Sequence, residues 1–206
     1  MRPKQTGTQS RPLADRVQRI VDGDLPILHL EPEVPTGSWA VHVDGLVERA
    51  VELQMDDIHA LGGITRVVDL HCVWGWSRPD CRWEGVHLNA LTTEASPLTE
   101  ASYVLITARS SPYASCLTLQ EARDGLFAWR VDGRDLKPER GWPLRFVSPA
   151  YKWAYKSVKW VERITFLDEF SPGFWEERVG DPKGDVPWDV LERFQGQAQA
   201  WRKGRR

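Results

Sequence analysis

The apolar positions of the chain fall in short runs that have the character of β-strands. The segment SWAVHVDGLVERAVEL at positions 38–53 contains two such runs around Asp44-Gly45, a dipeptide that favours a tight hairpin. Further strands are predicted within TRVVDLHCVWGW (65–76), ASYVLITA (101–108), LFAWRVDGRDLKPERGWPLRFVSP (126–149) and SVKWVERITFLDEF (157–170). The chain is therefore expected to contain many short strands.

Three segments predict short helices. MDDIHALGG (55–63) has aspartates in its first turn and glycine at its end, which favour the start and the stop of a helix. VHLNALTTEA (86–95) is the second segment, and SCLTLQEARDG (115–125), closed by Gly125, is the third. Because strands and helices do not alternate regularly, this order predicts an α+β domain.

The 206 residues are enough for one domain with extensions. Residues 1–19 are polar and predict a flexible tail. Residues 20–170 hold all of the strands and helices named above and form the predicted domain. Residues 171–206 contain several tryptophans and end in a basic tail, and we expect this extension to pack on the domain.

Composition limits the classes of partner. Apolar residues make up 41% and charged residues 27%, as in soluble globular proteins. A net charge of −2 offers no general attraction for nucleic acid, so none is expected as a partner. No apolar run is long enough for a membrane span. The first residues lack the apolar core of a secretory signal, so we expect a cytoplasmic protein, while removal of a signal from a longer form stays open.

The most unusual segment is DLHCVWGWSRPDCRWEGVHL, at positions 69–88. It holds two of the three cysteines and three of the eleven tryptophans. One interpretation is a zinc site, but the spacing of His71, Cys72, Cys81 and His87 differs from that of zinc fingers. A thiol redox centre is another, although there is no C-x-x-C pair. A third is that both cysteines are small buried apolar residues.

A family resemblance gives a fourth interpretation. HCVWGWSRPDCRWEGVHL resembles the sulfite oxidase family, in which an (R/H)-C-V-x-x-W-S…W-x-G-V-x-L pattern carries the cysteine that binds molybdenum. Other stretches follow in the family's order, from about Leu25 to Phe194: GLVERAVEL, LTLQEARDGLFAWRVDGRDLKPERGWPLRFVSP, YKWAYKSVKWVERI and GFWEERVGDPKGDVPWDVLERF. The last is similar to the end of the small haem-free bacterial members. The resemblance implies a sulfite-oxidase-type molybdopterin-binding domain with mixed β-sheets and short helices.

The resemblance implies Mo-molybdopterin as the cofactor and Cys72 as both the metal ligand and the catalytic residue. A thiolate is a suitable soft ligand for molybdenum that is already held by sulfur. Cys81 and Cys116 do not match the ligand position and are expected to be structural thiols. The indoles of this segment are expected to wall the metal pocket: Trp74, Trp76 and Trp83.

The phosphate end of such a cofactor needs cations and backbone donors. The resemblance places them at Arg145, in the P-L-R motif, and at Lys156, Ser157, Val158 and Lys159, where backbone N–H groups can serve beside the lysines. His29 is implied as an N-terminal contact to the cofactor. The alternative is that Lys152, Lys156 and Lys159 form a solvated basic face.

Two departures from the family bear on the substrate. Sulfite-oxidising members carry arginines beside the cysteine, where this chain has Trp74-Gly75-Trp76, and many members have His-Gly-Gly or Asn-Gly where it has Arg140-Gly141-Trp142. We expect oxygen-atom transfer on a small S- or N-oxide or sulfite-like substrate, with little oxidation of sulfite itself. Since no C-x-x-C-H haem motif occurs, electrons would pass through a separate partner. The rival hypothesis is a non-catalytic binding module that keeps the fold without metal.

Overall fold

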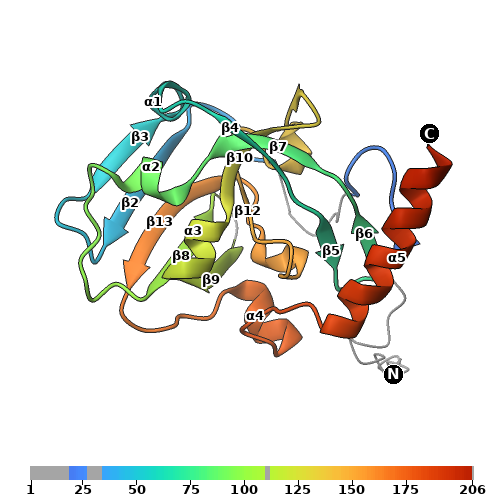
Figure 1. Ribbon diagram of the computed structural model, residues 1–206. Coiled ribbons are helices and arrows are strands. Elements are labelled where there is room, and N and C mark those ends of the chain that lie inside the picture. Colours follow the sequence, from blue (N-terminus) through green and yellow to red (C-terminus); the bar gives the residue numbers. More distant parts are fainter. Residues whose placement is uncertain (1–18, 27–33, 110–111, 206) are drawn as a thin grey trace, which may run out of the picture.

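The computed structural model describes residues 19–26, 34–109 and 112–205. These residues form three β-sheets, with short helices around them and one long helix near the C-terminus (Figure 1). The predicted α+β class, with mixed sheets and short helices, is confirmed. None of the helices in these ranges has the length and apolar character needed to cross a bilayer.

The largest mixed sheet has the strand order β3-β2-β13-β8-β9. Its strands are Val51–Gln54 (β3), Ala40–Gly45 (β2), Val161–Leu167 (β13), Tyr103–Ala108 (β8) and Ala114–Thr118 (β9). Strand β13 runs parallel to β2 and antiparallel to β8. Segments from both halves of the chain therefore meet in the middle of this sheet.

Strands β2 and β3 pair antiparallel, as predicted, but the tight turn expected at Asp44-Gly45 is wrong. Val43 pairs with Val51, so the connection between the strands is longer. Gly45 is needed for another reason. Its φ is +84°, and a Cβ atom at this position would lie 2.2 Å from the carbonyl oxygen of Phe166. The glycine thus permits close contact between β2 and β13.

The second sheet has the order β11-β10-β7-β4, with β12 paired to β10. Its strands are Arg134–Asp135 (β11), Leu126–Val131 (β10), Arg82–Val86 (β7), Ile64–Val67 (β4) and Arg145–Val147 (β12). A Cβ atom at Gly85 would lie 2.1 Å from the carbonyl oxygen of Phe127. The glycine of the W-E-G-V motif therefore lets β7 approach β10.

The third sheet is small and has the order β1-β6-β5. Its strands are Arg19–Ile20 (β1), Trp76–Arg78 (β6) and Leu70–Cys72 (β5). β5 and β6 form a hairpin in which Cys72 pairs with Trp76. The first part of segment 69–88 is thus a hairpin outside the two larger sheets, and its second part is strand β7 of the second sheet (Figure 1).

Two predicted helices are confirmed as short helices, α1 (Met55–Ala60) and α2 (Leu88–Thr92). The third is only partly right, because residues 115–118 belong to strand β9 and helix α3 is Leu119–Asp124. Thr118 and Glu121 explain the boundary: the Thr118 Oγ1 accepts from the Glu121 N–H at 3.3 Å, and the Glu121 carboxylate accepts from the Thr118 N–H at 2.9 Å. This capping box starts the helix after the strand.

The core lies mainly between the two larger sheets. Its largest members are aromatic and fully or almost fully buried: Trp39, Phe127, Trp129, Phe146, Trp160 and Phe166. A second cluster lies under the cysteine hairpin and includes Trp83, Cys81 and Leu70. Five of the eleven tryptophans are thereby buried in the interior: Trp39, Trp83, Trp129, Trp153 and Trp160.

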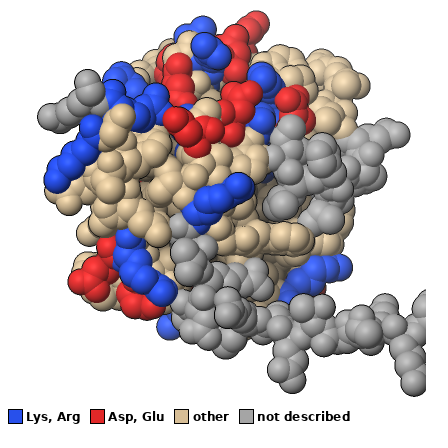
Figure 2. Space-filling model, turned by 90° about the vertical axis from the view of Figure 1, so that its right-hand side faces the viewer, with Lys and Arg blue, Asp and Glu red and all other residues tan. Residues whose placement is uncertain are grey.

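The C-terminal extension contains α4 (Phe174–Val179) and the long helix α5 (Trp188–Gly204). Helix α5 lies along β5 and β6 (Figure 1), where Phe194 makes an edge contact with His71 at 4.4 Å between ring centroids. Arg202 forms an ion pair with Asp80 at 2.6 Å. On this side of the molecule, lysines and arginines lie beside aspartates and glutamates (Figure 2). These contacts hold α5 against the β5–β6 hairpin and the loop that follows it.

Candidate active site

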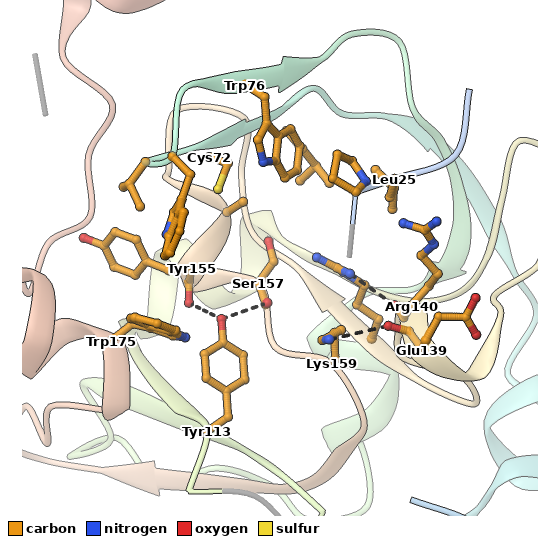
Figure 3. A pocket seen from close by; sticks show the side chains of 16 residues that line it. Leu25, Cys72, Trp76, Tyr113, Glu139, Arg140, Tyr155, Ser157, Lys159 and Trp175 are labelled. Carbon is orange, nitrogen blue, oxygen red and sulfur yellow. Dashed lines mark hydrogen bonds between the residues drawn. The ribbon is translucent and has the colours of Figure 1, made fainter. Parts of the chain in front are cut away.

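A pocket lies between the β5–β6 hairpin, the segment before β12 and the segment after it (Figure 3). Cys72 lines it at the end of β5 and is only 5% exposed. The chain turns immediately after this residue, since the Gly75 N–H donates to the Cys72 carbonyl oxygen at 3.0 Å and Gly75 has a φ of +88°. The turn holds the thiol at the pocket wall.

His71 does not join Cys72 in the pocket, because successive side chains of a strand point to opposite faces. Its Nδ1 lies 2.8 Å from the Ser77 Oγ, and burial lowers the pKa of His71 to about 4, so the ring is neutral at pH 7. The Nδ1 of His87 lies 3.2 Å from the Gly125 carbonyl oxygen. Within the described ranges no three His, Cys, Asp or Glu side chains group as metal ligands, which leaves the zinc interpretation without a site.

The other two thiols lie outside the pocket. Cys81 and Cys116 are fully buried, and burial raises the pKa of each to about 11. The Nη1 atom of Arg78 lies 2.8 Å from the Cys81 Sγ. Both thiols are therefore protonated at neutral pH, which suits a structural role and not metal binding.

Aromatic side chains surround the Cys72 end of the pocket: Trp74, Trp76, Tyr113, Tyr155 and Trp175. The Tyr113 hydroxyl donates to the Tyr155 carbonyl oxygen at 2.8 Å (Figure 3). This hydrogen bond fixes the Tyr113 side chain against the backbone of Tyr155. The expectation for Trp74 and Trp76 agrees with this arrangement, but Trp83 is not on the wall. It is fully buried in the core, where its Nε1 donates to the Val68 carbonyl oxygen at 3.2 Å.

Cations lie at the other end of the pocket: Arg140 and Lys159 are seen there in Figure 3, and Arg145, which also lines the pocket, is hydrogen-bonded to the Arg140 backbone. The Arg140 Nη1 is buried and has no hydrogen-bond partner among the residues that the structure describes. Burial lowers the pKa of this guanidinium, and the Asp24 carboxylate lies 4.0 Å from its Nη2. A buried donor of this kind is satisfied when an anion enters the pocket.

The segment 156–159 is divided between the pocket and the interior. Ser157 and Lys159 line the pocket. The side chain of Lys156 does not line it: it is 1% exposed and ion-pairs with Glu176, and its expected contact with the cofactor stays a prediction. Val158 is fully buried in the core, and the Ser157 N–H donates to the Ala154 carbonyl oxygen at 3.1 Å. His29 lies outside the described residues.

The donor set fits a metal cofactor that carries a phosphate. A thiol at one end is a ligand for a soft metal, and the cluster of cations at the other end suits a phosphate group. The pocket between them is partly enclosed by aromatic side chains. In this mixed-sheet fold, such a site defines a molybdopterin-binding oxidoreductase domain.

The chain belongs to this family. The model of the oxidoreductase molybdopterin binding domain family matches residues 28–175. An uncharacterized oxidoreductase of Bacillus subtilis, YuiH, is 36% identical over 174 residues, which cover 82% of this chain and 86% of the relative. The predicted family, its enzymatic class and its Mo-molybdopterin cofactor are thereby confirmed.

More distant relatives have named activities. The protein-methionine-sulfoxide reductase catalytic subunit MsrP of Campylobacter jejuni is 30% identical over 159 residues, covering 68% of this chain and 53% of the relative. The chain thus spans about half the length of that protein. The crystal structure of the sulfane dehydrogenase SoxCD from Paracoccus pantotrophus matches with a TM-score of 0.58 and 20% identity, over 64% of this chain and 38% of that one. This last likeness concerns the fold.

Sequence reasoning missed several pocket residues. Tyr113 and Tyr155 looked like ordinary aromatic residues, and Trp175 lies far along the chain in the C-terminal extension. Arg140 stood out only as a departure from the family's His-Gly-Gly or Asn-Gly. The available signal was that Arg140 lies five residues before Arg145, with Gly141 and Pro143 between them. Both residues favour a turn that could bring the two arginines together.

Proposed function

We propose that this protein is a molybdopterin oxidoreductase that reduces a neutral S-oxide with electrons from a separate partner. The observation that carries the proposal is that the two ends of the pocket differ in charge. Aromatic side chains surround its Cys72 end, and its cations are at the opposite end (Figure 3). A substrate that approaches Cys72 therefore meets indole and phenol rings.

The uncharged, aromatic surroundings of Cys72 favour a neutral substrate over an anionic one. A dianion such as sulfite loses hydration on entering an aromatic pocket and needs fixed cations in return. Two further cations, Arg109 and Lys156, are engaged elsewhere. Arg109 pairs with Glu162 at 2.8 Å and stacks 3.9 Å from the Trp39 ring centroid, while Lys156 pairs with Glu176. A sulfoxide group has a dipole but no net charge, so it loses less hydration free energy than sulfite when it enters the pocket.

Each pocket residue has a role in this proposal. The Cys72 thiolate would hold the metal, and Arg145, Arg140 and Lys159 would hold the phosphate end of the cofactor. The Ser157 hydroxyl is buried against Ser148, at 2.9 Å between their Oγ atoms, and would shape the segment that carries Lys159. When bound, the cofactor supplies two-electron oxygen-atom transfer chemistry. The protein contributes binding, orientation and exclusion of water by the aromatic wall.

The relatives support methionine sulfoxide as the first substrate to assay. MsrP of Campylobacter jejuni is named a protein-methionine-sulfoxide reductase, and its name as a catalytic subunit fits the use of a further protein. Reduction of a sulfoxide consumes two electrons and two protons and yields a sulfide and water. That electrons come from a separate partner, and that the protein is cytoplasmic, stay predictions.

The test is metal analysis followed by paired assays. Protein expressed in a cofactor-competent host should contain molybdenum near one atom per chain and should oxidise a reduced dye when methionine sulfoxide is added. Metal-loaded protein that reduces neither S- nor N-oxides would contradict the proposal. Protein without molybdenum from such a host would favour the non-catalytic binding module.

A further inference from the structure

A buried ion pair joins the C-terminal extension to the segment beside the pocket. The side chains of Lys156 and Glu176 are each 1% exposed, and they form a close salt bridge. The Lys156 Nζ also donates to the Cys116 carbonyl oxygen at 2.5 Å and to the Pro182 carbonyl oxygen at 2.9 Å. Two buried charges satisfied in this way hold their elements in one arrangement.

Glu176 also binds strand β9 directly. Its carboxylate accepts from the Ser115 Oγ at 2.7 Å and from the Cys116 N–H at 3.0 Å. It accepts as well from the Gly173 N–H, at the start of α4. The Glu176 carboxylate therefore connects helix α4 to both Lys156 and strand β9.

The residue before Glu176 is Trp175, which lines the pocket on the Cys72 side (Figure 3). Helix α4 has only six residues, so the position of Trp175 depends on contacts with the rest of the protein. Gly173 fits closely at the same place, because a Cβ atom there would lie 2.0 Å from the Ala114 carbonyl oxygen. The anchor and the close fit fix helix α4, and the indole then packs against the buried cluster that contains Val73, Trp153 and Tyr155.

We propose that Lys156 and Glu176 are positioning residues that hold Trp175 in the pocket wall, where its indole contacts the aliphatic part of a sulfoxide substituent longer than methyl and so selects for larger sulfoxides. The substrate choice rests on the proposed sulfoxide reduction, whereas the anchor rests only on the contacts of Glu176 and Gly173 described above. It assigns Lys156 a function that differs from cofactor binding. The C-terminal extension thereby takes part in substrate choice.

The anchor is tested without cofactor, by alkylation of Cys116 in metal-free protein, with mapping of the modified peptide. Cys116 is fully buried beneath α4 in the native protein. Glu176→Gln should expose it, since the buried lysine loses its counter-charge, and Gly173→Ala should do the same through a steric clash without changing a charge. The matched controls are Glu162→Gln, which weakens another ion pair, and Gly196→Ala, whose added methyl meets nothing within 4 Å. Protection equal to wild type in both test variants would overturn the anchor.

The selectivity is tested with loaded enzyme and two sulfoxides. Trp175→Ala should raise KM for methionine sulfoxide roughly 3- to 10-fold, as expected for loss of an aromatic contact, with kcat changed less than about twofold. KM for the smaller dimethyl sulfoxide should change little, and Trp175→Phe should restore most of the difference. Glu176→Gln and Gly173→Ala should repeat the KM pattern at equal molybdenum content, whereas a merely structural defect would lower metal content and kcat.

The outcomes separate the two proposals. If wild-type protein reduces no sulfoxide, the proposed function fails, and the alkylation result alone decides the anchor. If it reduces both sulfoxides and Trp175→Ala leaves both KM values unchanged, the selectivity is refuted while the function stands. If Glu176→Gln does not fold, the Gly173→Ala variant gives the decision.

Discussion

The Nη1 atom of Arg145 donates a hydrogen bond to the backbone carbonyl oxygen of Arg140, at 3.1 Å. Arg145 opens strand β12, and Arg140 ends the short 3₁₀-helix at Pro138–Arg140. Gly141 connects them with a φ of +108°, a conformation that glycine adopts readily. The bond therefore fixes the Arg145 guanidinium relative to the backbone that carries Arg140.

Replacement of Arg145 should reduce cofactor occupancy. We expect Arg145→Ala to lower the molybdenum content more than Arg145→Lys, because a lysine keeps the charge but loses bidentate geometry. Molybdenum per chain, measured by elemental analysis after expression in the same host, gives the comparison. The control is Arg163→Ala, which removes an exposed arginine that pairs with Asp44 away from the pocket. Equal occupancy in all of these proteins would remove Arg145 from the site.

Arg140 should contribute independently to the same end of the pocket. Its buried Nη1 has no protein partner in the described ranges, so we expect Arg140→Gln to weaken retention of the cofactor by about 1.5–3 kcal/mol, the usual worth of a hydrogen bond to a charged group. The measurement is the rate at which molybdenum and pterin are lost on dialysis of the purified protein. A rate equal to wild type would show that no anion contacts Arg140.

Cys72→Ser should abolish the molybdenum–thiolate absorption and the activity while the protein stays folded. A hydroxyl is a poor anionic ligand at neutral pH, whereas serine is close to cysteine in size and can keep the backbone pairing of Cys72 with Trp76. Circular dichroism reports the fold, and visible absorption reports the ligand. Cys81→Ser and Cys116→Ser should keep the metal, and loss of metal only from Cys81→Ser would show that the ligand was wrongly assigned.

The aromatic wall around Cys72 should make sulfite a poor substrate. We expect weak or no turnover of sulfite with an artificial acceptor, and measurable turnover of a neutral S- or N-oxide with a reduced dye. The two steady-state rates should be compared on one preparation with a known metal content. Efficient oxidation of sulfite at physiological salt would contradict the proposed preference and leave the family unaffected.

Gly85→Ala should destabilise the fold, because the new methyl group would overlap the backbone of β10 at Phe127 and Ala128. We expect a loss of about 1–3 kcal/mol in the free energy of unfolding, as for other overpacked sites. Chemical denaturation of the metal-free protein measures it. Gly196 lies in the middle of α5, and a Cβ atom there would meet nothing within 4 Å. Gly196→Ala should therefore leave the stability unchanged or slightly higher.

Local patterns predicted much of the secondary structure. In the strands at 40–45, 103–108 and 161–167, buried apolar residues alternate or nearly alternate with partly exposed ones, and this pattern is visible in the sequence without a fold. The strand Arg82–Val86 was not predicted, because its R-W-E-G-V residues have a glycine and two charges. Helix α5 was missed as well, since only Val190, Phe194 and Ala198 of its residues are fully buried. Partners elsewhere in the chain stabilise both elements.

Sequence alone determined the family, the cofactor class and the candidate ligand Cys72, because a motif is a property of neighbouring residues. The tertiary structure decided which charged groups reach the pocket. Lys156 and Lys159 are three residues apart, yet one is buried against Glu176 and the other lines the pocket. Arg140 and Trp175 come to the same pocket from distant segments. Direction and burial of a side chain depend on contacts between segments, which spacing along the chain does not specify.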